Sequence, residues 1–289
     1  MAAPLPASSR PQSTGQDPSI TVRIFTRMKG MRYIAVLIVG PCLDRPEAES
    51  LLSSLHPGGR LVRLEGPLAI YRIRREEKEE AIRDLNAVRI LKGIPYVVVT
   101  YKTSGTIRKA LEVGRRGLYA KKHLFILHFL HLVGRLKGLP RTGWRVRGIG
   151  NPESVAEHSH RASVLAFLLY GWEGAVSMLL HDLHEALIGD LLPWEEGKEE
   201  AEGEAARRLF CMIEHLYPEL PSYWALQREY KDADLLELQL QAVEYEATRG
   251  LDPTEFLADE MSTIEGSRLK RHILEYRNLL RTLYKCEKS

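Results

Sequence analysis

The chain has few cysteines and no long apolar run, which argues against a disulfide-rich protein and against a membrane-spanning one. Cys42, Cys211 and Cys286 are odd in number and far apart in a chain of 289 residues, so we expect neither a disulfide framework nor a thiolate metal cluster. The apolar run at 33–39 is much shorter than the roughly 20 residues that cross a bilayer. Residues 1–20 lack the apolar core of a secretory signal. These absences predict a protein of the reducing cytoplasm with no place in a membrane.

The composition is ordinary for a globular protein, but the charge is distributed unevenly. Residues 1–150 carry 27 basic against 11 acidic side chains, whereas the remainder carries 14 against 27. Such asymmetry favours two units with different surfaces, and it allows the two halves to attract one another. Residues 1–30 precede both units, and we expect a disordered tail there because this segment is rich in proline and serine.

Residues 31–103 predict a small α/β unit. Its expected elements are a strand at 32–40, a helix at 45–55, a strand pair at 60–76 broken at Gly66-Pro67, a helix at 76–92 and a strand at 95–103. The order β-α-β-β-α-β predicts a ferredoxin-like sandwich. We find no chemical motif in this unit, and the fold alone indicates no function.

A basic linker helix is expected at 104–122. The segment 101–122 holds seven basic residues and one acid, Glu112. A strip of this kind can bind phosphate or nucleic acid. We favour the plainer interpretation, a solvated linker helix or a contact for the acidic second unit.

The second unit, 123–289, is predicted to be helical throughout. Apolar periodicity marks helices at about 119–138, 154–171, 173–189, 199–217, 222–247 and 253–285. Ser154 is expected to cap the second of these, with Glu157 completing a capping box, which gives Glu157 a structural role. The fold class is therefore a two-domain α+β protein whose second domain is an all-α bundle.

Three short motifs within this unit predict a metal site. They contain His158, the pair His181-Asp182, and Asp234, and each lies in an apolar helical pattern. A buried histidine or a His-Asp pair on its own is more often structural, but buried charges are costly unless they are paired or bind metal. Two imidazoles and two carboxylates suit one divalent ion such as Mn²⁺, Co²⁺ or Fe²⁺, with Mg²⁺ and Zn²⁺ left open.

Glu185 lies one helical turn after His181 and is expected to face the same cavity. Because it is not among the four ligands, it is suited to orient or deprotonate a water, or to protonate a leaving oxygen. His184 falls on another face of the predicted helix, and we expect it to be exposed.

These motifs resemble those of the HD-domain phosphohydrolases, specifically the branch of 5'-deoxynucleotidases that hydrolyse deoxynucleoside 5'-monophosphates. The resemblance runs from about 124 to 281 and is carried by RTGW (141–144), PESVAEHSHRAS (152–163), HDLHEALIGDLLP (181–193) and DADLLELQLQAVEYE (232–246). It implies an HD-domain helical bundle, Glu185 as the general acid/base, and Asp190 as a contact of the sugar 3'-hydroxyl.

The resemblance also implies that Arg141 and Trp144 select the substrate. A guanidinium can hold a phosphate bidentately, and an indole can pack against a sugar face that lacks a 2'-hydroxyl. Bacterial members have the two residues adjacent, whereas Thr142-Gly143 separates them here. Arg145 and Arg147 are therefore further candidates for phosphate binding.

The predicted function is metal-dependent hydrolysis of (deoxy)nucleoside 5'-monophosphates to nucleoside and phosphate, in a chain that forms homodimers by analogy with related enzymes. One alternative is a phosphodiesterase acting on cyclic or oligonucleotides, although two-metal enzymes need further histidines that have no obvious counterpart here. The other is a non-catalytic nucleotide sensor whose first unit contacts RNA. The intact ligand set and Glu185 argue against that alternative.

Overall fold

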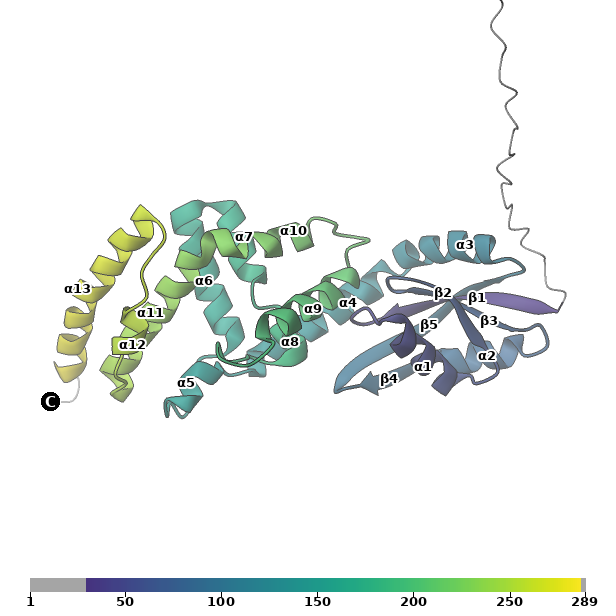
Figure 1. Ribbon diagram of the computed structural model, residues 1–289, viewed down its shortest axis with the longest axis horizontal. Coiled ribbons are helices and arrows are strands. Elements are labelled where there is room, and N and C mark those ends of the chain that lie inside the picture. Colours follow the sequence, from purple (N-terminus) through teal and green to yellow (C-terminus); the bar gives the residue numbers. More distant parts are fainter. Residues whose placement is uncertain (1–29, 287–289) are drawn as a thin grey trace, which may run out of the picture.

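The computed structural model describes residues 30–286, so the tail expected at 1–30 lies outside the described residues except for Gly30. A five-stranded antiparallel sheet occupies one end of an elongated molecule, and a mostly helical part extends from it to the other end (Figure 1). The predicted two-part α+β layout is confirmed. None of the described helices is long and apolar enough to span a membrane.

The sheet is built around its first strand. The elements of this part are β1 Met31–Val39, α1 Arg45–Leu55, β2 Arg60–Glu65, β3 Leu68–Arg74, α2 Lys78–Leu85, β4 Ala87–Leu91 and β5 Ile94–Ser104. The strand order is β2-β3-β1-β5-β4, and every neighbouring pair is antiparallel. Helices α1 and α2 cover one face, where Leu52 and Leu85 pack with Ile34 and Tyr71 in a single apolar cluster.

The prediction of a helix at 76–92 is wrong for the second half of that segment. Helix α2 ends at Leu85, and residues 87–91 form the edge strand β4 instead. Lys92 and Gly93 both have positive φ, at 50° and 75°, as the two central residues of a tight hairpin turn require. Asn86 fixes the start of the hairpin, because its side chain accepts from the backbone N–H of Thr100 and donates to the hydroxyl of the same residue.

The helical part begins with two consecutive helices, the first packed on the sheet and the second leading away from it. Its elements are α3 Ile107–Ala120, α4 Lys122–Val133, η1 Gly134–Gly138, α5 Thr142–Val146, α6 Val155–Tyr170, α7 Trp172–Leu180, α8 Glu185–Ile188, α9 Lys198–Cys211, α10 Leu220–Ala225, η2 Leu226–Tyr230, α11 Lys231–Arg249, α12 Thr254–Leu257 and α13 Ile264–Cys286. The predicted capping box of Ser154 and Glu157 is confirmed at the start of α6.

The basic segment is more than a solvated linker, since one side of α3 lies on the sheet. A Cβ added at Gly114 would come within 2.6 Å of the Leu68 side chain, and one at Gly117 within 2.8 Å of Tyr101. Glycine at both positions therefore allows the helix backbone to approach the strands closely. The basic side chains Arg115 and Arg116 occupy its exposed side.

The two parts share one apolar core. Leu37 on β1 belongs to the same cluster as Phe125 on α4 and Phe210 on α9, and that cluster continues to Leu180 and Leu183. Strand β1 is consequently buried on both faces, which explains its nearly continuous apolar sequence. The sheet thus packs against helices that also support the chain around residues 180–183.

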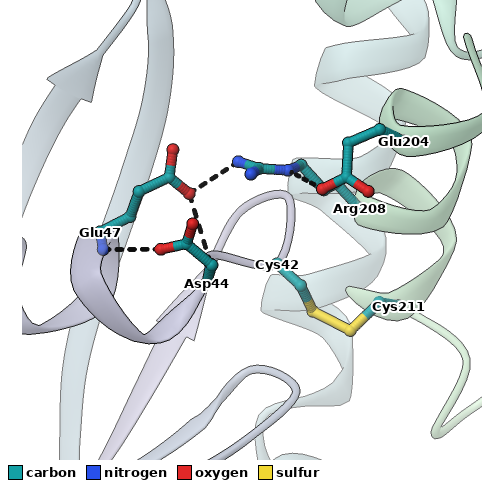
Figure 2. Close-up of a disulfide and its surroundings, with 6 residues drawn as sticks. All are labelled: Cys42, Asp44, Glu47, Glu204, Arg208 and Cys211. Carbon is teal, nitrogen blue, oxygen red and sulfur yellow. Dashed lines mark hydrogen bonds and ion pairs between the residues drawn. A yellow bond between two sulfur atoms is a disulfide. The ribbon is translucent and has the colours of Figure 1, made fainter. Parts of the chain in front are cut away.

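A disulfide also joins the two parts, contrary to the expectation from the cysteine spacing. Cys42, just after β1, bonds Cys211 at the end of α9 across 169 residues of sequence (Figure 2). Arg208, one helical turn before Cys211, bonds Glu204 on its own helix and Glu47 on α1, both at 2.7 Å. Spacing along the chain could not predict this pair, because only the packing of the sheet on α9 brings the two cysteines together.

Candidate active site

Three elements that are distant in sequence deliver the four predicted metal ligands. His158 comes from α6, Asp234 from the first turn of α11, and His181 with Asp182 from a turn between α7 and α8. The sequence predicted one continuous helix at 173–189, but the helix is interrupted at 181–184. Trp224 supports this turn by donating its indole N–H to the carbonyl of His181 at 3.0 Å.

Three of the four predicted ligands, His158, His181 and Asp234, place ligand atoms within 4.8 Å of one another, as one shared cation requires. His158 Nε2 lies 3.1 Å from Asp234 Oδ1 and 3.3 Å from His181 Nε2. His181 Nε2 lies 3.0 Å from Asp182 Oδ2. Nitrogen and oxygen ligands bound at about 2.1 Å lie roughly 3.0–3.4 Å from one another, and these three separations fall in that range. Two others are longer, 3.7 Å from His158 Nε2 to Asp182 Oδ2 and 3.8 Å from His181 Nε2 to Asp234 Oδ1, so a bound cation would have to draw these atoms together or sit at wider ligand angles.

The electrostatics of this cluster also fit a cation. Burial opposes a charge on His158, but Asp234 and Glu237 outweigh it and raise the pKa of the imidazole to about 10. The pKa of Asp234 falls to about 2, since the histidines overcome the effect of burial. Without a metal, the carboxylates therefore retain protons on the imidazoles. A divalent cation would supply that positive charge and displace the protons.

Glu185 stands apart from the ligands as a buried acid. It is the first residue of α8, and its Oε2 has no hydrogen-bond partner among the described residues. Burial, followed by the negative charges of Asp182 and Asp190, raises its pKa to about 10. Burial and these neighbouring charges thus favour the protonated form of Glu185, which is the form that a proton donor requires.

One cavity of about 950 Å³ collects almost all of the predicted residues. Its lining includes seven of the eight: Arg141, Trp144, His181, Asp182, Glu185, Asp190 and Asp234. The eighth, His158, is fully buried behind them. The cavity is large enough for a small ligand such as a nucleotide.

Arg141 faces the ligand cluster. Its Nη1 lies 3.2 Å from Asp182 Oδ2, and the carboxylates of Asp182, Asp190 and Asp234 raise its pKa even though burial opposes this. Asp190 holds the loop that carries Arg141, because its carboxylate accepts from the backbone N–H of Thr142 and its carbonyl accepts from the Thr142 hydroxyl at 2.9 Å.

Trp144 is less available than the sequence suggested. Its side chain is only 1% exposed and packs against Tyr245 and Phe256, with ring centroids 5.2 and 4.6 Å away. The indole N–H donates to Glu153 at 3.0 Å. Trp144 therefore forms part of the cavity wall and does not project into the cavity. Arg147 is already paired with Glu255.

Sequence reasoning missed two other buried groups near the site. His184 is 3% exposed, so its expected exposure was wrong; it lies against the Trp224 ring and 3.6 Å from Glu202. Glu237 is fully buried and contacts Nδ1 of His158. Its position three residues after Asp234 was the available signal, since that spacing places both carboxylates on one side of α11.

The fold and the site together define an α+β protein whose helical part carries a candidate divalent-cation centre. A family model described as HD domain matches residues 133–275. Human 5'-deoxynucleotidase HDDC2 is 36% identical over 139 residues, covering 42% of this chain and 68% of the human protein. The 5'-deoxynucleotidase hdd1 of Schizosaccharomyces pombe is 34% identical over 149 residues, covering 44% of this chain and 75% of that protein. The chain belongs to the HD-domain family and is similar to its 5'-deoxynucleotidases.

Proposed function

We propose that this protein is a metal-dependent phosphomonoesterase that hydrolyses deoxynucleoside 5'-monophosphates to nucleoside and phosphate. The observation that carries the proposal is the convergence of the ligand cluster, the buried acid Glu185 and the cation Arg141 on one cavity. The similarity to 5'-deoxynucleotidases supports the choice of substrate.

The residues would divide the work by their chemistry. His158, His181, Asp182 and Asp234 would hold one divalent ion. When bound, such an ion lowers the pKa of a water molecule and offsets negative charge on the phosphate. Arg141 would bind the phosphate with paired N–H donors. Its 3.2 Å contact with Asp182 places the guanidinium beside the ligand cluster.

Glu185 would act as the acid. Attack of water on phosphorus forms one P–O bond, and the bond to the 5'-oxygen breaks. Protonated Glu185 gives its proton to the departing 5'-oxygen and recovers a proton from the attacking water, so the site ends the cycle as it began. Its raised pKa, about 10, supports the role of acid over that of base.

The sugar would lie near Asp190 and the Trp144 wall. We assign Asp190 to the 3'-hydroxyl, which requires its carboxylate to accept from the sugar as well as from Thr142. Trp144 would shape the sugar side of the cavity from within the wall, where Tyr245 and Phe256 hold it rigid.

We propose that the sheet part, 31–103, has the ferredoxin-like topology, which the order β2-β3-β1-β5 supports, with β4 as an addition. The linker 104–122 and the HD unit 123–289 complete the division of the chain. Homodimerisation is supported by apolar side chains exposed around the α6–α7 corner, namely Phe167, Leu168 and Trp172.

The cytoplasmic location is also proposed, since nucleoside monophosphates are made and consumed inside cells. The disulfide between Cys42 and Cys211 counts against a strongly reducing compartment. The identity of the metal stays open between Mn²⁺, Co²⁺, Fe²⁺, Mg²⁺ and Zn²⁺, because nitrogen and oxygen ligands suit all of them to some degree.

A substrate panel tests the function. The purified full-length protein, loaded separately with each metal, is assayed against deoxynucleoside and ribonucleoside 5'-monophosphates, 3'-monophosphates and cyclic dinucleotides. We expect phosphate release from the deoxynucleoside 5'-monophosphates. Turnover confined to cyclic dinucleotides would make the protein a phosphodiesterase, and nucleotide binding without turnover under any metal would make it a sensor.

A further inference from the structure

The two histidines of the ligand cluster are held in different ways. His181 Nδ1 lies 2.6 Å from the carbonyl oxygen of Met178, a neutral acceptor in the same turn. His158 Nδ1 instead contacts the carboxylate of Glu237 on α11, and both side chains are completely buried. In each case the Nδ1 contact leaves Nε2 directed at the ligand cluster. Of these two histidines, His158 is the one with a charged partner behind it.

Glu237 is itself fixed by a cation. Arg161, three residues after His158 on α6, places Nε 2.8 Å from Glu237 Oε1. The same guanidinium bonds Gln241 at 2.7 Å and Glu244 at 2.8 Å, both further along α11. The path from Arg161 through Glu237 to His158 therefore ties α6 to α11, the two helices that supply His158 and Asp234.

We propose that Glu237 is a positioning residue for the metal centre, acting through His158. This inference rests on the proposed function, because it assumes a cation at the ligand cluster. Glu237 accepts the Nδ1–H of the imidazole, which holds the tautomer whose Nε2 lone pair faces the cation and makes that nitrogen a stronger donor. Arg161 holds the carboxylate in place through its 2.8 Å bond to Oε1.

A purely structural ion pair accounts for this arrangement less well. Burying a carboxylate and an imidazole beside a part-buried guanidinium is costly, and apolar side chains of similar volume usually stabilise a core as well or better. Carboxylates that orient a metal-bound histidine are a recurrent exception, and their loss typically weakens metal binding by about 10–100-fold. Glu237 is one hydrogen bond away from a ligand, as such a role requires.

Metal affinity tests the proposal without relying on turnover. The full-length protein is stripped with a chelator, and Mn²⁺ is titrated by calorimetry into the wild type and the variants Glu237→Gln and Glu237→Ala. We expect the dissociation constant to rise by about 10–100-fold in Glu237→Ala. We expect a smaller rise in Glu237→Gln, because the amide oxygen still accepts from Nδ1–H but carries no charge.

The matched control is Glu246→Gln. Glu246 lies on the same helix and accepts hydrogen bonds from Arg277 and Arg281. The change therefore also removes a carboxylate that is paired with arginine, but the pair that it breaks joins α11 to α13 and not to α6. It is expected to leave the Mn²⁺ affinity unchanged. Far-UV circular dichroism and thermal melting of the metal-free forms show whether each variant is folded. If Glu237→Ala does not fold, the Mn²⁺ affinity of the near-isosteric Glu237→Gln decides the question.

The outcomes separate this inference from the proposed function. If the wild type binds no divalent ion, the metal centre itself is refuted. If the wild type binds one ion, and folded Glu237→Gln and Glu237→Ala bind it equally well, the metal centre stands and the role of Glu237 is refuted. An equal loss of affinity in Glu246→Gln would show that weakening any ion pair of α11 is sufficient, and would also overturn the proposal.

Discussion

Replacing Glu185 by glutamine separates acid catalysis from metal binding. The substitution keeps the size of the side chain and removes its proton. Before a cation binds, burial and the negative charges of Asp182 and Asp190 raise the pKa of Glu185 to about 10, which favours the protonated form. A protonated carboxyl group can donate its proton directly, whereas a base role would first require the group to lose that proton.

Glu185→Gln is therefore expected to retain the metal and lose about 10²–10⁴-fold in kcat. The direction in which kcat changes with pH shows whether Glu185 acts as an acid or as a base. A carboxyl group that must be protonated supports activity below its pKa, so wild-type kcat should fall as pH rises through that value, which a bound cation will move below 10. Steady-state kinetics from pH 6 to 10, with metal content measured by elemental analysis, provide the assay. Normal turnover by the variant, or loss of its metal, would refute the reasoning.

Three further predictions concern stability. Burial and Glu237 raise the pKa of Glu153 from 4.5 to about 7, so between these pH values the folded protein keeps a proton that the unfolded chain releases, and the free energy of unfolding falls by at most about 3 kcal/mol as the pH rises. The Glu153→Gln variant should therefore have a higher melting temperature than the wild type at pH 8 but not at pH 4. Equal shifts in melting temperature at both pH values would contradict this. The Cys42–Cys211 bond spans 169 residues, so Cys42→Ser should lower the free energy of unfolding by about 3–5 kcal/mol in urea titrations, whereas unchanged stability would mean that the bond does not form. A chain that begins at Gly117 lacks the strands that cover Phe125, so it should aggregate or bind a hydrophobic dye, and a monomeric, cooperatively folding product would disprove the dependence on the shared core.

Local patterns were sufficient where one element carries its own signal. The apolar run of β1 and the break at Gly66-Pro67 predicted the strands, and Ser154 with Glu157 predicted the start of α6. The ligand residues were identifiable because an ionisable side chain in an apolar helix is costly to bury unless it is paired or binds metal. These inferences needed no knowledge of long-range packing.

The missing elements depend on contacts between distant segments. Residues 87–91 are compatible with a helix, and only pairing with β5 makes them a strand. The break in the helix at 181–184 is supported by Trp224, more than forty residues away. Glu237 resembled an ordinary residue of an acidic helix, since its importance comes from His158 on another helix.

The most direct test of the central claim is the metal content and turnover of Asp234→Ala beside the wild type. Asp234 is the only predicted ligand contributed by α11, and its Oδ1 lies 3.1 Å from His158 Nε2. We predict that the wild type binds one divalent ion per chain and releases phosphate from deoxynucleoside 5'-monophosphates. The folded variant should do neither. Stoichiometric metal and normal turnover in Asp234→Ala would contradict the assignment of this cluster as the active site.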